Sequence, residues 1–208
     1  MDTYLQPTAI FDSDNTILIE KVSELVYGLD EPIAQAKALF YFVRDEIPYN
    51  LYVKKHMPEH FRASNTLKRG KGYCVQKAVL LITMARAVGI PARLGFAKIR
   101  NHLLPQKVLD VLKINIFPWH GYADLFLTRK WVKATPAFDL RMCEDNGFLS
   151  VEFDGCNNAL LPAQDKQGRL HIEYLLDRGP FDTVPLADIR KALIERNLLN
   201  PKEIPGER

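Results

Sequence analysis

Cysteine is scarce in this chain of 208 residues, occurring only as Cys74, Cys143 and Cys156. An odd, sparse set without a CxxC pair makes a poor disulfide framework and a poor zinc site, so we expect free thiols in a reducing compartment. His56 and His60 are four residues apart, but a proline between them argues against one regular helix face. We therefore expect no bound metal and no cofactor.

Long hydrophobic runs are also missing. No apolar run approaches the roughly 20 residues that span a bilayer, and residues 1–7 lack the basic and apolar regions of a secretory signal. We expect a cytoplasmic protein that does not enter a membrane. Hydrophobic residues at 47% and charged residues at 25% are typical of a globular protein with a core. The length predicts a single domain over residues 1–200, followed by a frayed tail at 201–208.

Acidic residues are nearly absent from residues 54–113, which contain 13 Lys/Arg and 2 Asp/Glu, a local balance of 13 − 2 = +11. The rest of the chain has 15 Lys/Arg and 23 Asp/Glu, or 15 − 23 = −8. Two explanations of this uneven charge distribution are about equally good. The basic residues are solvated on several faces, or they create a positive field that favours a thiolate or binds an anionic partner. The stretch contains no aromatic-basic interleaving and no recognition motif, so we expect no nucleic-acid partner.

Helices are predicted early in the chain and strands later. The helices are expected at 14–27, 30–46, 74–88, 104–112 and 185–198, with residues 49–72 mostly irregular apart from a short helix near Glu59. The strands are expected at 92–99, 149–153 and 171–176, with a hairpin formed by 119–127 and 130–135. Few βαβ alternations occur in this order, which indicates the α+β class. The helix at 74–88 is apolar around much of its circumference and should be buried.

Cys74 stands at the predicted start of that buried helix, after Gly70 and Gly72, which allow a sharp turn and close approach of a substrate. A thiol in the first helical turn feels the positive end of the helix dipole, which favours the reactive thiolate. The backbone N–H of Cys74 lacks an intrahelical partner there, so it can donate to a developing oxyanion. The alternative is a buried structural cysteine.

His120 lies on the first strand of the predicted hairpin. A two-residue turn at 128–129 sets Leu127 opposite Lys130, and His120 then shares a face with Thr135 and Asp139 across the ladder. Either residue could orient the imidazole, although only Asp139 offers a carboxylate that stabilises an imidazolium. A proline at 136 interrupts the regular ladder, so this register is a hypothesis.

Two segments together resemble the transglutaminase-like superfamily. The first is Gly72-Tyr73-Cys74 with the downstream Gly89-Ile90-Pro91-Ala92-Arg93, and the second is His120 with the later Trp131-Val132. The similarity spans about residues 40–140 and keeps the order Cys, His, acid. It implies a papain-like fold, in which N-terminal helices, including a buried central helix bearing Cys74, pack on an antiparallel sheet. It also implies acyl transfer through a thioester.

One position departs from the family pattern, which usually reads Trp-Val-x-x-Asp-Pro. This chain has Thr135 where the family has the aspartate, and the nearest carboxylate is Asp139. We favour Asp139 as the third catalytic residue beside Cys74 and His120. Orientation of His120 by Thr135, or impaired catalysis, are the alternatives.

The resemblance therefore implies a cysteine-dependent amide hydrolase or peptidase acting on a peptide or protein amide. Transamidation of protein glutamine and a catalytically silent binding module are the alternative functions. Family members usually draw a second oxyanion donor from an upstream aromatic or polar side chain, for which Tyr49, Asn50 and Tyr52 are candidates. The sequence does not fix the oligomeric state.

Overall fold

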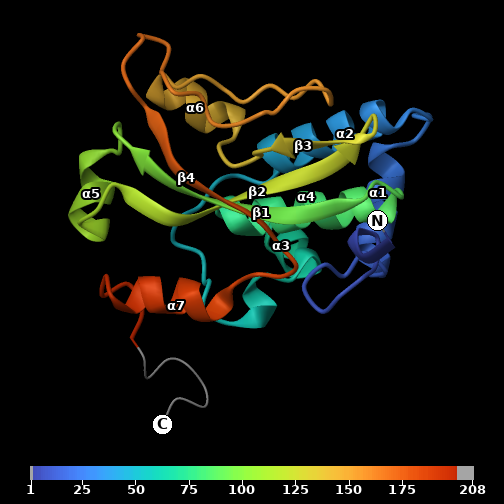
Figure 1. Cartoon of the computed structure of the whole chain (residues 1–208), viewed down its shortest axis with the longest axis horizontal. Coiled ribbons are helices and arrows are strands. Elements are labelled where there is room, and N and C mark those ends of the chain that lie inside the picture. The colour runs from blue at the N-terminus through green and yellow to red at the C-terminus, as the bar shows by residue number, and fades with distance from the viewer. Residues whose placement is uncertain (1, 201–208) are drawn as a thin grey trace.

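The computed structural model describes residues 2–200, in which helices surround a four-stranded sheet (Figure 1). In chain order the elements are η1 (Asp2–Tyr4), α1 (Thr16–Leu25), α2 (Pro32–Tyr41), η2 (Phe42–Glu46), η3 (Pro58–His60), α3 (Ala63–Arg69), α4 (Cys74–Ala87), β1 (Ala92–Asn101), α5 (Gln106–Leu112), β2 (Ile116–Leu127), β3 (Lys130–Ala134), α6 (Leu140–Asn146), β4 (Ile172–Phe181) and α7 (Leu186–Ile194). This order of helices and an antiparallel sheet confirms the predicted α+β class.

The sheet is antiparallel with the strand order β3-β2-β1-β4. Leu127 pairs with Lys130, as the two-residue turn predicted, because Thr128 and Arg129 both adopt positive φ angles of 48° and 65°. Two consecutive positive φ values match the twist of a tight hairpin. The ladder between β2 and β3 ends at the pair Ala123–Ala134, and the Thr135 N–H donates to the Ala159 carbonyl at 2.9 Å instead, so the predicted ladder that sets His120 opposite residues 135–139 was wrong.

Helix α4 forms the centre of the molecule and packs against β1 and β2 on one side and α1, α2 and α3 on the other (Figure 1). All of its residues from Cys74 to Arg86 are buried, which confirms the prediction made from its apolar circumference. A helix buried on every side draws its stability from packing rather than from an amphipathic face. The core around α4 therefore holds the position of its first turn.

Two short helices were missed by sequence reasoning. Helix α3 begins after Arg62, which makes no side-chain cap; instead Asp12 accepts a hydrogen bond from the Ser64 N–H at 3.2 Å. Because that cap comes from 52 residues away in the sequence, no local pattern announces it. Helix α6 is capped by its own preceding residue, Asp139.

The strand predicted at 149–153 was wrong, since these residues belong to no strand. The carbonyl of Val151 accepts a hydrogen bond from the Arg44 guanidinium at 2.6 Å rather than from a neighbouring strand. Strand β4 extends to Phe181 and α7 is shorter than predicted, whereas the tail predicted at 201–208 lies outside the described residues. No described helix is long and apolar enough to cross a membrane.

Candidate active site

A backbone contact just before α4 helps to position Cys74. Tyr49 pairs with Gly72 in an isolated parallel bridge, in which the Asn50 N–H donates to the Gly72 carbonyl at 2.9 Å. The next residue but one is Cys74, the first residue of α4. Cys74 is 8% exposed, so a small part of its surface is accessible to solvent.

Gly121 on β2 allows the start of α4 to approach the sheet very closely. A Cβ atom built at Gly121 would lie 2.9 Å from the Cα of Val75, so only glycine permits this distance. The approach directs the Gly121 N–H toward the Cys74 sulfur. His120, the neighbour of Gly121 in the chain, lines the same cavity as Cys74.

The Cys74 thiol rests in its neutral form. Burial raises its pKa to about 11, although the N–H groups of Gly121 and Val75 and the charge of Lys55 act in the opposite direction. Burial alone lowers the pKa of the His120 imidazole to about 4. A thiol and a neutral imidazole are therefore favoured over a preformed ion pair, because both charged forms lose hydration in this site.

His120 is 2% exposed and its Nε2 atom is buried without a hydrogen-bond partner in residues 2–200. Thr135, in the family's aspartate position, is fully buried and its Oγ1 likewise has no partner there. Tyr174 on β4 lies near both: its ring is 6.1 Å from the His120 ring, and its hydroxyl is close to Thr135. The Tyr174 side chain is thus close to both His120 and Thr135.

Asp139 has other partners. One carboxylate oxygen accepts from the Met142 N–H at 2.9 Å and caps α6, while the other accepts from the Tyr49 N–H at 2.8 Å. Among the described residues no hydrogen bond joins Asp139 to His120, and no carboxylate contributes to the pKa of that imidazole. The role of Asp139 as the orienting acid stays a prediction, but its observed contacts are those of a scaffold residue.

The three candidate oxyanion donors differ in their surroundings. Burial raises the pKa of Tyr49 well above its ordinary value, and a charge on Cys74 would raise it further. Asn50 accepts from the Tyr52 N–H at 2.9 Å, and Tyr52 is 66% exposed. Tyr73, which sequence reasoning missed, has a buried hydroxyl without a partner in the described chain and is also affected by the charge of Cys74.

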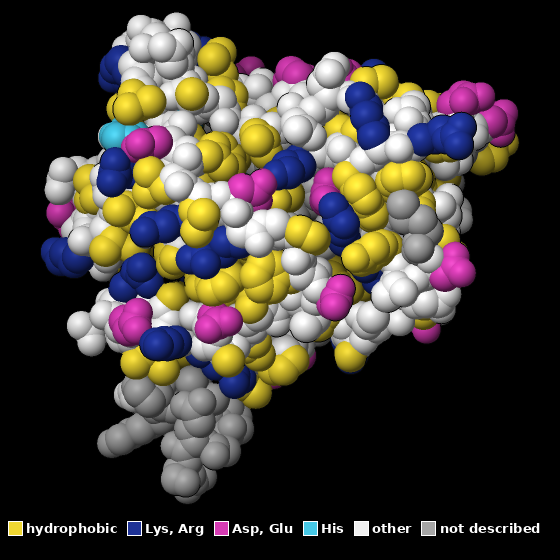
Figure 2. Space-filling view, in the orientation of Figure 1, with side chains coloured by type: hydrophobic (Ala, Val, Ile, Leu, Met, Phe, Trp, Pro, Cys, Tyr) yellow, Lys and Arg dark blue, Asp and Glu magenta, His cyan; other side chains and the backbone are white. Residues whose placement is uncertain are grey.

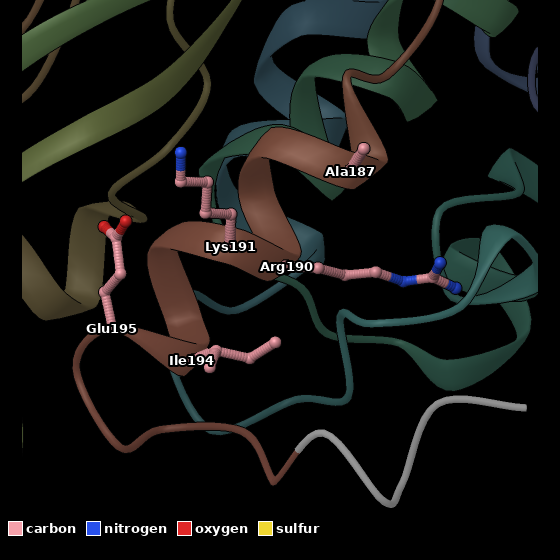
Figure 3. Close-up of a pocket in the computed structure, with 5 residues that line it drawn as sticks. All are labelled: Ala187, Arg190, Lys191, Ile194 and Glu195. Atoms are coloured by element: carbon pink, nitrogen blue, oxygen red, sulfur yellow. The ribbon is translucent and has the colours of Figure 1, made fainter. Parts of the chain in front are cut away.

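Cys74 and His120 line one cavity of about 810 Å³, together with all three candidate donors. Its walls come from residues 49–56, the segment around α5, strand β2 and α7. A smaller pocket of about 360 Å³ lies on α7 and includes neither Cys74 nor His120 (Figure 3). Thr135 and Asp139 do not line the large cavity.

The other two cysteines lie apart from this cavity. Cys143 is buried in α6, where burial raises its pKa to about 11, and Cys156 is partly exposed in a turn. Neither lines the cavity. In residues 2–200 no three His, Cys, Asp or Glu side chains gather as a metal site would require.

A cysteine at the start of a buried helix, packed on an antiparallel sheet that carries a histidine, defines the papain-like class of α+β folds. The family model of the transglutaminase-like superfamily matches residues 20–136, more than half of the chain. The chain belongs to the transglutaminase-like superfamily.

A solved structure has a similar fold. A "putative cysteine protease" from Cytophaga hutchinsonii matches with a TM-score of 0.50 at 16% identity, over 64% of this chain and 40% of that one. A "putative protease" from Parabacteroides distasonis matches at 12% identity with a TM-score of 0.42, over 61% of this chain and 25% of that one. This chain therefore spans less than half the length of either neighbour. No curated protein matches the sequence.

Proposed function

We propose that the chain is a cysteine-dependent amide hydrolase, with Cys74 as nucleophile and His120 as general base and acid. The observation that carries this proposal is the approach of α4 to β2 at Gly121, since it brings the thiol and the imidazole to one cavity wall. Membership of the superfamily and the names of the two structural neighbours support the same reaction class.

In the proposed reaction His120 removes the thiol proton as the sulfur attacks the amide carbonyl, because both groups are neutral at rest. A C–S bond forms, the C–N bond breaks, and His120 delivers the proton to the leaving amine. Water then attacks the thioester, the C–S bond breaks, and the proton from water returns to the sulfur through His120. The products are a carboxylic acid and an amine.

The oxyanion needs donors on the side of the sulfur. The N–H of Cys74 in the first turn of α4 has no intrahelical partner and is one of them. We propose the hydroxyl of Tyr49 or Tyr73 as the second, because a charge on Cys74 acts on both phenols. Tyr52 is a poorer choice, since its side chain is 66% exposed.

For the orienting group we propose Thr135 in preference to Asp139. The buried Oγ1 of Thr135 and the buried Nε2 of His120 both lack partners within the described chain, and the Tyr174 side chain lies near both. A hydroxyl can hold a neutral imidazole in one tautomer but stabilises an imidazolium less than a carboxylate does. Proton transfer to His120 would therefore be slower than in a site with a complete Cys-His-Asp triad.

In the test, the protein is incubated with a denatured protein as substrate. Hydrolysis of that substrate creates new amino termini, which are counted by amine labelling. We expect hydrolysis by the wild type and none by Cys74→Ala, with Cys143→Ala and Cys156→Ala as controls that retain it. Incorporation of a tagged alkylamine in place of hydrolysis would indicate a transamidase instead. Equal reactivity of all three thiols toward an electrophile, without hydrolysis, would indicate a silent binding module.

A further inference from the structure

The large cavity has an unusual set of charges on its walls. The described residues that line it include the cations Lys54, Lys55, Lys107 and Arg196, but no Asp or Glu. Cavity walls with cations and no carboxylates attract anions and repel cations, especially where low-dielectric walls concentrate the field. Part of the positive charge of residues 54–113 therefore lies on the walls of this cavity.

Lys55 is a lining cation whose charge acts on the Cys74 thiol. Its Nζ lies 5.4 Å from the ring centroid of Tyr73, the residue before Cys74. The ammonium donates to the carbonyls of Leu51 at 2.5 Å and Val53 at 3.4 Å, which uses two of its three N–H groups. Residues 2–200 offer Lys55 no carboxylate partner, so its charge is not neutralised by this part of the protein.

The loop that bears Lys55 is held from both sides. Gln76, in the first turn of α4, donates to the Lys54 carbonyl at 2.9 Å, and Arg190 of α7 donates to the His56 carbonyl at 2.6 Å. Figure 3 shows Arg190 reaching away from Lys191 and Glu195. With both neighbours of Lys55 tethered, the ammonium is positioned before any ligand arrives, which reduces the entropy lost on binding.

The remainder of the cavity is mostly apolar. Its apolar side chains come from α5 and the segment that follows it, such as Val108, Val111 and Leu112, and from α7, such as Ile189 and Leu193. Figure 2 shows Lys and Arg side chains mixed with hydrophobic ones over the region of α5 and α7. About 810 Å³ is enough for a ligand of ordinary small-molecule size or for several residues of a peptide.

We propose that the substrate is an amphiphilic amide with an apolar chain and a carboxylate, and that Lys55 binds this carboxylate beside the scissile bond. The apolar chain lies along α5 and α7, where it displaces water from hydrophobic walls. The inference rests on the proposed function for the reaction, but the binding preference can be measured without it. Lys55 is a specificity residue in this account, because its unused N–H is a charged donor near Tyr73 that no carboxylate of residues 2–200 occupies.

The test uses three probes that share a decanoyl amide and carry head groups of different charge: N-decanoylglycine, its neutral primary amide, and the cationic N-(2-aminoethyl)decanamide. Binding is measured by calorimetry on the Cys74→Ala protein, in which no turnover occurs. We expect the anion to bind about tenfold or more tighter than the neutral amide, and the cation to bind most weakly, as a charge-assisted hydrogen bond predicts. Equal affinities, or no binding of any probe, would overturn the inference.

A Lys55→Met substitution in the same background separates charge recognition from support of the loop. It should reduce the preference for the anion over the neutral amide to about onefold while leaving the neutral amide unchanged. Lys68→Met, an identical change at an exposed position of α3 outside the cavity, should alter neither. Equal weakening of all three probes by Lys55→Met would mean that Lys55 only supports the loop, which contradicts the inference.

Turnover of the same probes by the protein with Cys74 intact is a separate measurement. Release of decanoate would support both proposals. A clear preference for the anion in the Cys74→Ala protein, combined with no acylation of Cys74 by any amide or ester, would refute the proposed reaction but not the binding inference.

Discussion

Gly121 of β2 lies in direct contact with Val75 of α4, so that an added Cβ would come within 2.9 Å of the Val75 Cα and 3.0 Å of its Cγ2. The contact joins the strand that carries His120 to the turn of helix that begins with Cys74. It explains why a helix and a strand from distant parts of the sequence present their reactive groups to one cavity.

Gly121→Ala should therefore impair the site more than the fold. The methyl group would push the start of α4 away from β2, at a cost of about 1–3 kcal/mol in unfolding free energy. We expect the acylation rate of Cys74 per folded molecule to fall as well. Gly95→Ala is the matched control: its Cβ would overlap the Tyr122 ring in the same sheet, away from Cys74. Loss of stability in both variants with normal acylation in both would contradict this account.

The pH dependence of acylation should reflect a neutral pair. His120 must be unprotonated to act as a base, and burial lowers its pKa to about 4, so kcat/KM should rise with pH through that region. It should then stay level through neutral pH, because the Cys74 thiol has a pKa near 11. The thiolate ultraviolet absorbance at neutral pH should be the same in wild type and Cys74→Ala. An absorbance that depends on Cys74 would indicate a resting ion pair instead.

Thr135→Asp tests the position at which the chain departs from its family. A carboxylate behind His120 would favour the imidazolium, so the acid limb of the pH profile should move from about 4 toward the ordinary value of 6.5. Acylation at neutral pH should become faster, since the imidazolium that forms would be better stabilised.

Asp139→Ala is the counterpart of that experiment. Removal of this cap should lower the unfolding free energy by about 0.5–2 kcal/mol through α6 and leave the acid limb where it is. If Asp139→Ala shifts the acid limb while Thr135→Asp does not, Asp139 is the orienting acid and our preference for Thr135 is wrong.

His171 should contribute to the pH dependence of stability. Its ring is 1% exposed, stacks on Phe148 at 3.9 Å, and has both nitrogens unpartnered within the described residues. Burial lowers its pKa to about 4 from 6.5, although Asp165 acts in the opposite direction. The unfolded state therefore binds more protons between pH 6.5 and 4, and stability falls as pH falls through this window.

Chemical unfolding at several pH values measures this contribution. Between pH 6.5 and 4 the unfolding free energy of the wild type should fall by an amount on the order of 1–3 kcal/mol because of His171. The His171→Phe variant should not show this part of the fall. His102→Gln, at an exposed histidine, should leave the loss unchanged. An identical pH dependence in wild type and His171→Phe would show that His171 does not titrate as its burial implies.

The features that local sequence encodes were predictable. The apolar run after Cys74 predicted the buried helix, and the two residues of the turn at 128–129 predicted that Leu127 pairs with Lys130. Both rest on periodicity or turn length within a few residues. Gly121 next to His120 was visible in the sequence, but its contact with α4 depends on how two distant elements pack.

The features that depend on distant partners were not predictable. An aspartate after a strand can orient a histidine or cap a helix, and the sequence around Asp139 does not distinguish these uses. Its contacts with Tyr49 and Met142, which show the helix cap, depend on residues that the local pattern does not bring together. Tyr174 follows the family segment by almost forty positions along the chain. Lys55 belonged to a basic stretch that gave no reason to single it out.

The central claim is that Cys74 reacts because His120 takes its proton. The most direct measurement is the rate at which an activated ester acylates Cys74 at neutral pH, followed by intact-protein mass and assigned to the residue by peptide mapping. Replacement of His120 by Ala should slow this step about 100-fold or more, because general base catalysis contributes at least that much, and the adduct should be a thioester that hydroxylamine cleaves. Equal rates in wild type and His120→Ala, or acylation at Cys143 or Cys156 instead, would contradict the account.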